Sequence, residues 1–513
     1  MHNDVTTGRT TINPRYAERQ MVVLAAILAL AAALRILLLG QNSIWLDEAV
    51  VVRATQARWD ELYGFLQVSD AHPPLYYVLL KAWVSVAGMS EVAFRLPSVM
   101  FSAASVPLTY MLARRACSDT VSLLAAFLLS VSPFQIMAGQ EARMYPLLEF
   151  LALGSTLALV AAAKRGGLLR WAAYAFVATL MVYTHYLGFL VLAAHGLWVL
   201  LAAPRQLGSW VLAVVAAAIL FLPWEPSFWF QAHHIHDSAF YVNTNKLLDL
   251  TDLLGLTAFG GSLVGMAGYL RGGRLGGLEQ LIVLLPFLVV LGLGARALAP
   301  RDRRGLALVG LPVVVPVGVM LGLSIIRPMF VPRWFSFLGP FYCVLLAEGI
   351  LAASAGLVAE RGRAIVCITA GLVLYSVPTL AVYYLNPDSH PFRWREAAQF
   401  VERRMRPGDY MVYVTPAKLP FTYYFHSVDP SLTLTPREEA PVRGGRLFDA
   451  TWAHDLARTH PRIWLVASLP LSDAARARLF GALEKSYRIV DSAGFGGANI
   501  FELQASGATA VGM

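Results

Sequence analysis

The chain has 513 residues, of which 57% are hydrophobic and only 14% are charged. A soluble domain is nearer a quarter charged, and apolar stretches of the length that crosses a bilayer recur along most of this chain. The composition therefore argues against a soluble globular protein and indicates a polytopic membrane protein. The net charge of +9 lies mostly in short loops between apolar stretches, which indicates membrane topology and excludes a nucleic-acid-binding face.

Basic clusters set the expected orientation of the chain, because Lys and Arg concentrate in cytoplasmic loops. The clusters are Arg9/Arg15/Arg19, Arg114/Arg115, Lys164/Arg165, Arg205, Arg301/Arg303/Arg304 and Arg361/Arg363. The spans that place all of them in the cytoplasm run at about 21–40, 95–113, 120–138, 146–163, 170–184, 188–203, 209–223, 279–297, 305–326, 335–355 and 364–384. The sequence thus predicts about 11 transmembrane helices, a cytoplasmic tail at 1–20 and an extracytoplasmic C-terminus.

Two further apolar stretches remain, at 74–88 and 250–270. A crossing at 74–88 would place two basic clusters, Arg114/Arg115 and Lys164/Arg165, outside the cytoplasm. We therefore expect a helix at the outer interface with its apolar face in the lipid. The glycine-rich 250–270 is interpreted as interfacial or re-entrant. If both crossed, the total would be 13. The first outer loop then spans 41–94, and the membrane domain spans 21–385.

The segment 386–513 is more polar and has a different pattern. It predicts a helix at 394–405, strands at 410–414 and 463–467, a helix at 472–485 and strands at 487–491 and 499–503. Strands alternating with helices predict a small extracytoplasmic α/β domain. No glycine-rich phosphate loop opens a helix there. The three cysteines, Cys117, Cys343 and Cys367, lie in or beside apolar segments, which predicts neither disulfides nor a thiolate zinc site.

Adjacent carboxylates follow the first span, at Asp47 and Glu48. They fit an acidic first helical turn, but they also fit a general base that takes a proton from an attacking hydroxyl. A second acidic position, Glu141, follows the third span. It fits a simple pair with Arg143, and it also fits a polar cleft built from two outer loops.

Candidates for phosphate binding lie in two other outer segments. His72 precedes Pro73 and Pro74, which enforce an extended entry to the next helix and would hold the imidazole rigidly over the membrane. Arg327 and Arg333 flank a proline-rich turn on the face where arginine is least expected. They either snorkel or form a clamp for an anionic lipid head.

Histidines also raise the question of a metal site. His185 stands alone, and His233, His234 and His236 form a run with Asp237 beside it. Their spacing fits no standard zinc motif. No metal site is predicted, and a divalent-metal requirement stays open.

Five motifs together resemble glycosyltransferase family 39-like membrane proteins, which include protein O-mannosyltransferases and lipid A aminoarabinose transferases. The motifs are Asp47-Glu48, His72-Pro-Pro-Leu75, Phe94-Arg95-Leu-Pro-Ser98, Glu141-Ala-Arg143-Met-Tyr145-Pro and Pro332-Arg333-Trp334. The resemblance covers roughly 20–385, and the stretch from Trp394 to Asp409 resembles the extracytoplasmic domain of bacterial relatives.

The resemblance implies a GT-C architecture and an inverting transfer from a polyprenyl-phosphate-linked sugar in the cavity of the first loop. Asp47 matches the family's first-loop aspartate and Glu141 its second acidic position. Arg333 matches the late-loop position that meets the donor phosphate. The chain departs at Val50, where aminoarabinose transferases carry arginine, and at His72, where they carry lysine. The donor sugar, hexosyl or pentosyl, therefore does not carry over.

The functional hypothesis is a bacterial inner-membrane glycosyltransferase acting on an extracytoplasmic acceptor hydroxyl. The assigned residues are catalytic Asp47, Glu48 and Glu141; phosphate-binding Arg333, Arg327, His72 and Arg143; and cavity-lining Tyr145, His185 and Arg95. No cofactor beyond the lipid-phosphate sugar is expected, metal assistance is at most weak, and the acceptor is a glycolipid, polysaccharide or protein. A transporter or flippase of a lipid-linked substrate is the main alternative. It would predict inverted repeats, and none is apparent. A non-catalytic membrane anchor would leave the outer carboxylates and arginines unexplained.

Overall fold

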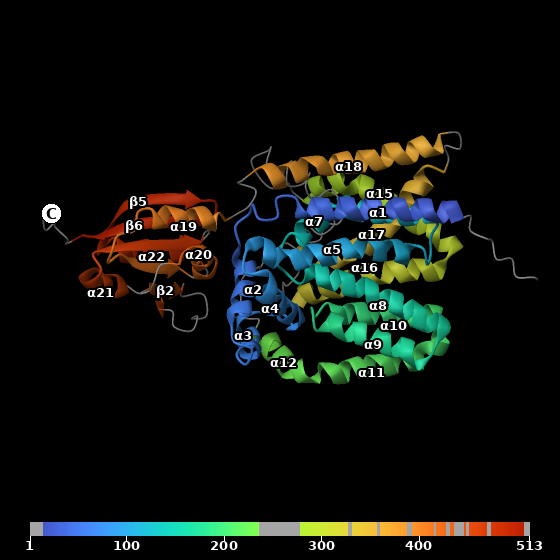
Figure 1. Ribbon diagram of the computed structural model, residues 1–513, viewed down its shortest axis with the longest axis horizontal. Coiled ribbons are helices and arrows are strands. Elements are labelled where there is room, and N and C mark those ends of the chain that lie inside the picture. The colour runs from blue at the N-terminus through green and yellow to red at the C-terminus, as the bar shows by residue number, and fades with distance from the viewer. Residues whose placement is uncertain are drawn as a thin grey trace, which may run out of the picture.

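The computed structural model describes residues 14–234, 277–326, 331–355, 360–386, 392–414, 417–426, 431–435, 446–447, 451–468 and 473–506. A bundle of long helices forms one part of the molecule and a small mixed sheet with its helices forms the other (Figure 1). The predicted helical membrane part with a small C-terminal α/β part is confirmed.

Each of the predicted spans coincides with a helix or a bent helix pair. The bundle helices are α1 (Pro14–Ile36), α5 (Glu91–Ala113), α6 (Asp119–Val131), α7 (Pro133–Gly139), α8 (Tyr145–Arg165), α9 (Leu168–Val182), α10 (Gly188–Ala202), α11 (Leu207–Phe221), α15 (Gly277–Arg301), α16 (Arg303–Ile326), α17 (Gly339–Ala353) and α18 (Arg361–Leu385). Within the described residues, seven helices are long and apolar enough to cross a membrane, or eight if α6 and α7 form one span. The number of crossings stays a prediction.

A proline explains why one predicted span is bent. α6 and α7 meet at Ser132 with an angle of 58° between them. Pro133 lacks a backbone N–H and disfavours a helical residue before it, so one helix ends at Val131 and another begins at Pro133. The bend directs the chain toward the loop that carries Glu141.

Three short helices cover one end of the bundle. α2 (Leu46–Gln56), α3 (Leu62–Ser69) and α4 (Leu75–Ala87) lie at the end nearest the C-terminal sheet, whereas α1 begins at the far end (Figure 1). The expected interfacial helix at 74–88 corresponds to α4. The turns η1 (Pro204–Gln206) and η2 (Leu222–Trp224) flank α11, and α12 (Glu225–His234) follows. The predicted re-entrant segment 250–270 lies outside the described residues.

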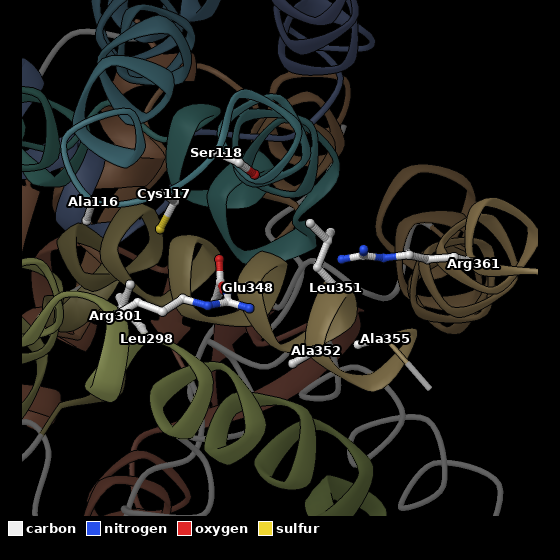
Figure 2. A pocket seen from close by; sticks show the side chains of 10 residues that line it. All are labelled: Ala116, Cys117, Ser118, Leu298, Arg301, Glu348, Leu351, Ala352, Ala355 and Arg361. Carbon is white, nitrogen blue, oxygen red and sulfur yellow. The ribbon is translucent and has the colours of Figure 1, made fainter. Parts of the chain in front are cut away.

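The opposite end of the bundle gathers the predicted basic loops. A cavity of about 370 Å³ is lined by residues 116–118, Arg301, Glu348 and Arg361. Figure 2 shows the Arg301 side chain reaching toward Glu348, with Arg361 across the cavity, and an Nη1–Oε1 distance of 2.6 Å joins the first two. Three of the segments that the charge pattern assigned to one side of the membrane therefore lie together, next to Arg114/Arg115, at Arg301 and at Arg361.

The C-terminal part is a six-stranded sheet in the order β3-β2-β1-β4-β6-β5. Its strands are β1 (Tyr410–Val414), β2 (Ser431–Thr435), β3 (Arg446–Leu447), β4 (Arg462–Ser468), β5 (Tyr487–Phe495) and β6 (Ala498–Ala505). β1, β2, β3 and β4 pair in parallel, whereas β6 pairs antiparallel with β4 and β5. All the predicted strands are confirmed. The prediction missed β2 and β3, which lie in a stretch that had been interpreted as a linker.

Four helices accompany the sheet: α19 (Trp394–Glu402), α20 (Lys418–Tyr424), α21 (Thr451–Thr459) and α22 (Asp473–Leu483). α19 and α22 match the predicted helices. The apolar residues of β1 and β4 alternate between two buried clusters, one around Trp452 and Leu479 and one around Trp394 and Phe421. α20 was not predicted, and it contacts the membrane part next to α2.

Candidate active site

The site lies at the bundle end that carries α2, where four segments distant in sequence converge. α2 begins at Leu46, and Trp45 N–H donates to Glu48 Oε2 (3.4 Å), so a capping interaction fixes the first turn. Asp47 and Glu48 both lie in this turn. They point to different surroundings, and the structure gives them different chemistry.

The Glu48 side chain is fully buried, and its carboxylate pairs with the guanidinium of Arg95 from α5. Arg95 Nε and Nη2 donate to the two Glu48 oxygens at 2.8 and 2.7 Å, and the backbone N–H of Ala142 donates to Oε1 at 2.8 Å. The remaining Arg95 donors bond backbone carbonyls. This arrangement argues against the predicted catalytic role of Glu48 and the predicted cavity-lining role of Arg95. A fully satisfied buried pair instead joins α2, α5 and the 140–144 loop.

Asp47 lies beside Arg333. Asp47 Oδ2 and Arg333 Nη2 are 2.7 Å apart, and both side chains keep some exposure, at 15% and 26%. Arg333 follows Pro332 in η3 (Pro332–Leu338), and its guanidinium lies 5.0 Å from the centre of the Trp45 ring. The structure thus brings together the predicted base and the predicted phosphate ligand.

Glu141 completes an acidic group in the loop between α7 and α8. Burial, together with the charges of Glu48 and Asp47, raises the pKa of Glu141 to about 7, while Arg333 opposes that shift. A carboxyl group with a pKa near neutrality is suited to exchange a proton at physiological pH. The two predicted acidic positions do lie in one site.

Arg143 is buried and connects the acidic group to His72. Arg143 Nη1 donates to the backbone oxygen of Asp47 at 3.0 Å and lies 3.5 Å from Asp70 Oδ2. Asp70 Oδ1 is 2.5 Å from His72 Nδ1, and Tyr77 donates its hydroxyl to Oδ2 at 2.5 Å. Burial alone would raise the pKa of Asp70, but His72 and Arg143 hold it well below its usual range.

His185 faces His72 with ring centres 5.0 Å apart. The backbone N–H of Leu187 donates to His185 Nδ1 at 3.1 Å, so Nδ1 accepts and the proton of the neutral ring is on Nε2. Burial, together with the charges of His72 and Arg143, holds the pKa of His185 well below its usual range. Nε2 is buried, and it has no hydrogen-bond partner among the residues that the structure describes. Rings of Tyr145 and Trp334 lie 6.0 and 6.1 Å away.

Asp70 and Tyr77 are residues of this site to which sequence reasoning gave no role. Asp70 stands two residues before His72, a spacing that would have suggested an imidazole–carboxylate pair. Arg35 differs in the other direction. Although it lies late in the first predicted span, near the outer surface, it is fully buried and donates to Ser102 Oγ and to the carbonyls of Leu129 and Ser130.

Some predicted residues cannot be placed. Arg327, His236 and Asp237 lie outside the described residues. His233 is exposed, and its Nδ1 lies 2.7 Å from the carbonyl of Trp229. Among the side chains that the structure describes, no group of three or more His, Cys, Asp or Glu residues is placed to hold a metal ion.

Comparison with known proteins gives a partial match to one family model and a fold. The family model described as dolichyl-phosphate-mannose-protein mannosyltransferase matches residues 71–229. No curated protein sequence matches the chain. ArnT from Cupriavidus metallidurans in the apo state is similar in structure, with a TM-score of 0.62 and 14% identity over 95% of this chain and 98% of that one.

Two ligand-bound structures are also similar. The same ArnT bound to undecaprenyl phosphate has a TM-score of 0.53 and 14% identity over 96% of this chain and 98% of that one. The archaeal oligosaccharyltransferase AglB from Archaeoglobus fulgidus, in complex with an inhibitory peptide and a dolichol-phosphate, has a TM-score of 0.55 and 12% identity over 97% of this chain and 75% of that one. The chain is therefore a multi-pass membrane protein of the GT-C type.

Proposed function

We propose that the chain is a glycosyltransferase that moves a sugar, hexosyl or pentosyl, from a polyprenyl phosphate to an acceptor hydroxyl with inversion at the anomeric carbon. The GT-C fold, the matched mannosyltransferase segment and the lipid phosphates in similar structures support a lipid-linked donor. The observation that carries the proposal is the contact of Asp47 with Arg333 at 2.7 Å. It places a candidate base and a candidate phosphate ligand from distant segments in one partly open site.

The proposed reaction is a single displacement. Arg333 exchanges Asp47 for the donor phosphate, which frees the Asp47 carboxylate to take the proton of the acceptor hydroxyl. The hydroxyl oxygen bonds to the anomeric carbon, the bond to the phosphate oxygen breaks, and polyprenyl phosphate leaves with the bonding electrons. A guanidinium facing that phosphate stabilises the transition state more than the ground state, because negative charge grows on the leaving oxygen.

The other site residues complete the proposal. His72 and Arg143 are proposed to contribute positive charge toward the phosphate, and Arg327 is proposed as a second late-loop ligand. Glu141 accepts or returns a proton near neutral pH. No step is assigned to a metal ion. The site is proposed to face the extracytoplasmic side of a bacterial inner membrane, with a glycolipid, polysaccharide or protein as acceptor.

Purified protein and a panel of radiolabelled polyprenyl-phosphate sugars test the proposal. Asp47→Asn should lower turnover by about 10²–10⁴-fold, as loss of a general base typically does. Asp60→Asn is the matched control, because Asp60 is an exposed carboxylate of the same loop paired only with Arg58. Product stereochemistry, read by NMR, should be inverted. Normal turnover by Asp47→Asn would remove Asp47 as the base.

A graded series at Arg333 tests the phosphate contact. Lysine keeps the charge but loses the planar fork, so activity should fall from wild type to Arg333→Lys to Arg333→Ala, mainly in kcat. Arg58→Ala serves as the control because Arg58 is 75% exposed. Movement of the lipid-linked sugar across vesicles without transfer would instead identify the flippase alternative.

A further inference from the structure

The turn between α1 and α2, residues 37–44, is held by an unusual number of side chains. Every backbone carbonyl from Leu34 to Ser43 accepts a hydrogen bond. Two of these bonds come from nearby backbone N–H groups, from Leu39 to the carbonyl of Ile36 at the end of α1 and from Gln41 to the carbonyl of Leu38. Four side chains donate the other bonds. Tyr384 donates to the carbonyl of Leu34, and Gln140 to those of Arg35 and Leu37. Arg95 donates to the carbonyls of Leu39, Asn42 and Ser43, and Arg395 to those of Gly40 and Gln41.

The turn needs this support because its backbone is strained. Leu38 has a φ of 55°, in the left-handed region that costs an L-residue about 1–2 kcal/mol. Leu38 is 44% exposed, so burial of its side chain contributes little to holding the conformation. Hydrogen bonds from outside the turn must therefore stabilise it.

Part of that support comes from the C-terminal part of the chain. Arg395 of α19 donates to Gly40 O at 2.9 Å and Gln41 O at 3.1 Å, and its Nη2 lies 2.5 Å from Glu91 Oε1. Tyr424 of α20 accepts from the backbone N–H of Ile44 at 2.7 Å and donates to the same Glu91 oxygen at 2.9 Å. Arg395 N–H also donates to Ser43 Oγ at 3.2 Å.

The held turn leads directly into the candidate active site. Ile44 is followed by Trp45, which lies under Arg333, and then by Leu46 and Asp47. A guanidinium that bonds two adjacent carbonyls fixes the direction in which the chain enters α2. Small displacements matter there, because the position of Asp47 relative to a reacting hydroxyl must hold to within a fraction of an ångström.

We propose that Arg395, assisted by Tyr424, is a positioning residue through which the C-terminal α/β part orders the first outer loop and sets the place of Asp47. The catalytic consequence rests on the proposed glycosyl transfer, whereas the ordering of the turn does not. The C-terminal part is then required for the geometry of the candidate active site, through the turn that leads into α2.

Hydrogen exchange on the full-length protein in nanodiscs tests the ordering. Arg395→Met should raise amide exchange in residues 37–48 by about tenfold or more, the effect of losing charge-assisted hydrogen bonds that oppose local opening. Tyr424→Phe should act mainly at Ile44. Arg393→Met is the matched control, because Arg393 immediately precedes α19 and its side chain pairs with Glu396 of the same helix rather than with the turn. β1 and β4 should exchange as in wild type.

Kinetics separate positioning from general stability. With a donor that wild type transfers, Arg395→Met should lower kcat about tenfold with little change in donor KM, and Arg395→Lys should recover part of kcat because it keeps the pair with Glu91. Unchanged exchange in residues 37–48 overturns the proposal, and so does increased exchange spread equally over the sheet. If wild type transfers no sugar, exchange still decides the ordering, and only the proposed function fails.

Discussion

The buried Glu48–Arg95 pair gives a sharp test of how the first loop is held. Glu48 is 0% exposed at its side chain and Arg95 4%. Arg95→Met removes both donors to the carboxylate and leaves it with the N–H groups of Ala142 and Trp45. It also leaves three carbonyls of the turn without their donor. Removing one partner of a buried ion pair costs about 3–5 kcal/mol, and we expect a loss of unfolding free energy in that range.

Equilibrium unfolding in mixed detergent micelles measures this loss. Glu48→Gln should cost a similar amount, about 3–5 kcal/mol, because it leaves the Arg95 charge buried without a counter-charge, although Arg95 keeps its carbonyl acceptors. The double variant should cost less than the sum of the two single variants. Arg53→Met is the control: Arg53 is exposed on α2, and its replacement should stay within about 0.5 kcal/mol of wild type. A loss below about 1 kcal/mol for Arg95→Met would refute the reasoning.

Three further predictions follow from the site and its turn. Because the pKa of Glu141 is raised to about 7 in the folded protein, the stability it contributes is complete below its ordinary pKa of about 4.5 and is lost as pH rises through 7. Glu141→Gln should therefore gain stability relative to wild type across that window in pH-dependent unfolding, and parallel curves would contradict the assignment. His185→Leu should lower turnover more than His185→Gln in the transfer assay, because glutamine still offers an N–H donor in place of Nε2–H; equal losses would assign His185 to packing. Leu38→Gly should leave unfolding free energy unchanged or raised by up to about 1 kcal/mol, because glycine adopts positive φ without strain; Leu37→Gly, the neighbouring exposed leucine, should lower it.

The sequence by itself determined the membrane part of this protein. Apolar stretches of bilayer length and the spacing of basic loops are local properties, since a span must be apolar over its own length whatever it packs against. The helices therefore coincide with the predicted spans. The strands β1 and β4 were equally clear, because continuous apolar runs bounded by turn residues predict buried strands. The stretch with β2 and β3 gave no such local signal.

Sequence reasoning predicted which residues gather at the candidate site, but not which partners each of them contacts. Asp47, Glu141 and Arg333 were assigned to one site, and they do lie together. Glu48 had the same local pattern as Asp47, and nothing in sequence distinguishes two adjacent carboxylates in one helical turn. Only the tertiary structure decides that Arg95 faces one of them and Arg333 the other. Burial and a bidentate partner give Glu48 a structural part, whereas partial exposure leaves Asp47 open to a substrate.

Long-range hydrogen bonds were likewise beyond local reasoning. Sequence analysis placed Arg395 in a predicted helix and gave it no role, yet it bonds the carbonyls of Gly40 and Gln41, more than 350 residues away in sequence. Backbone carbonyls carry no residue identity, so sequence contains no sign of which side chain will bond them. The sequence thus predicted where the apolar helices lie and which residues are candidates for the site. The tertiary structure alone decided which of them remain free to act, because burial and pairing are set by neighbours that the chain brings from far away.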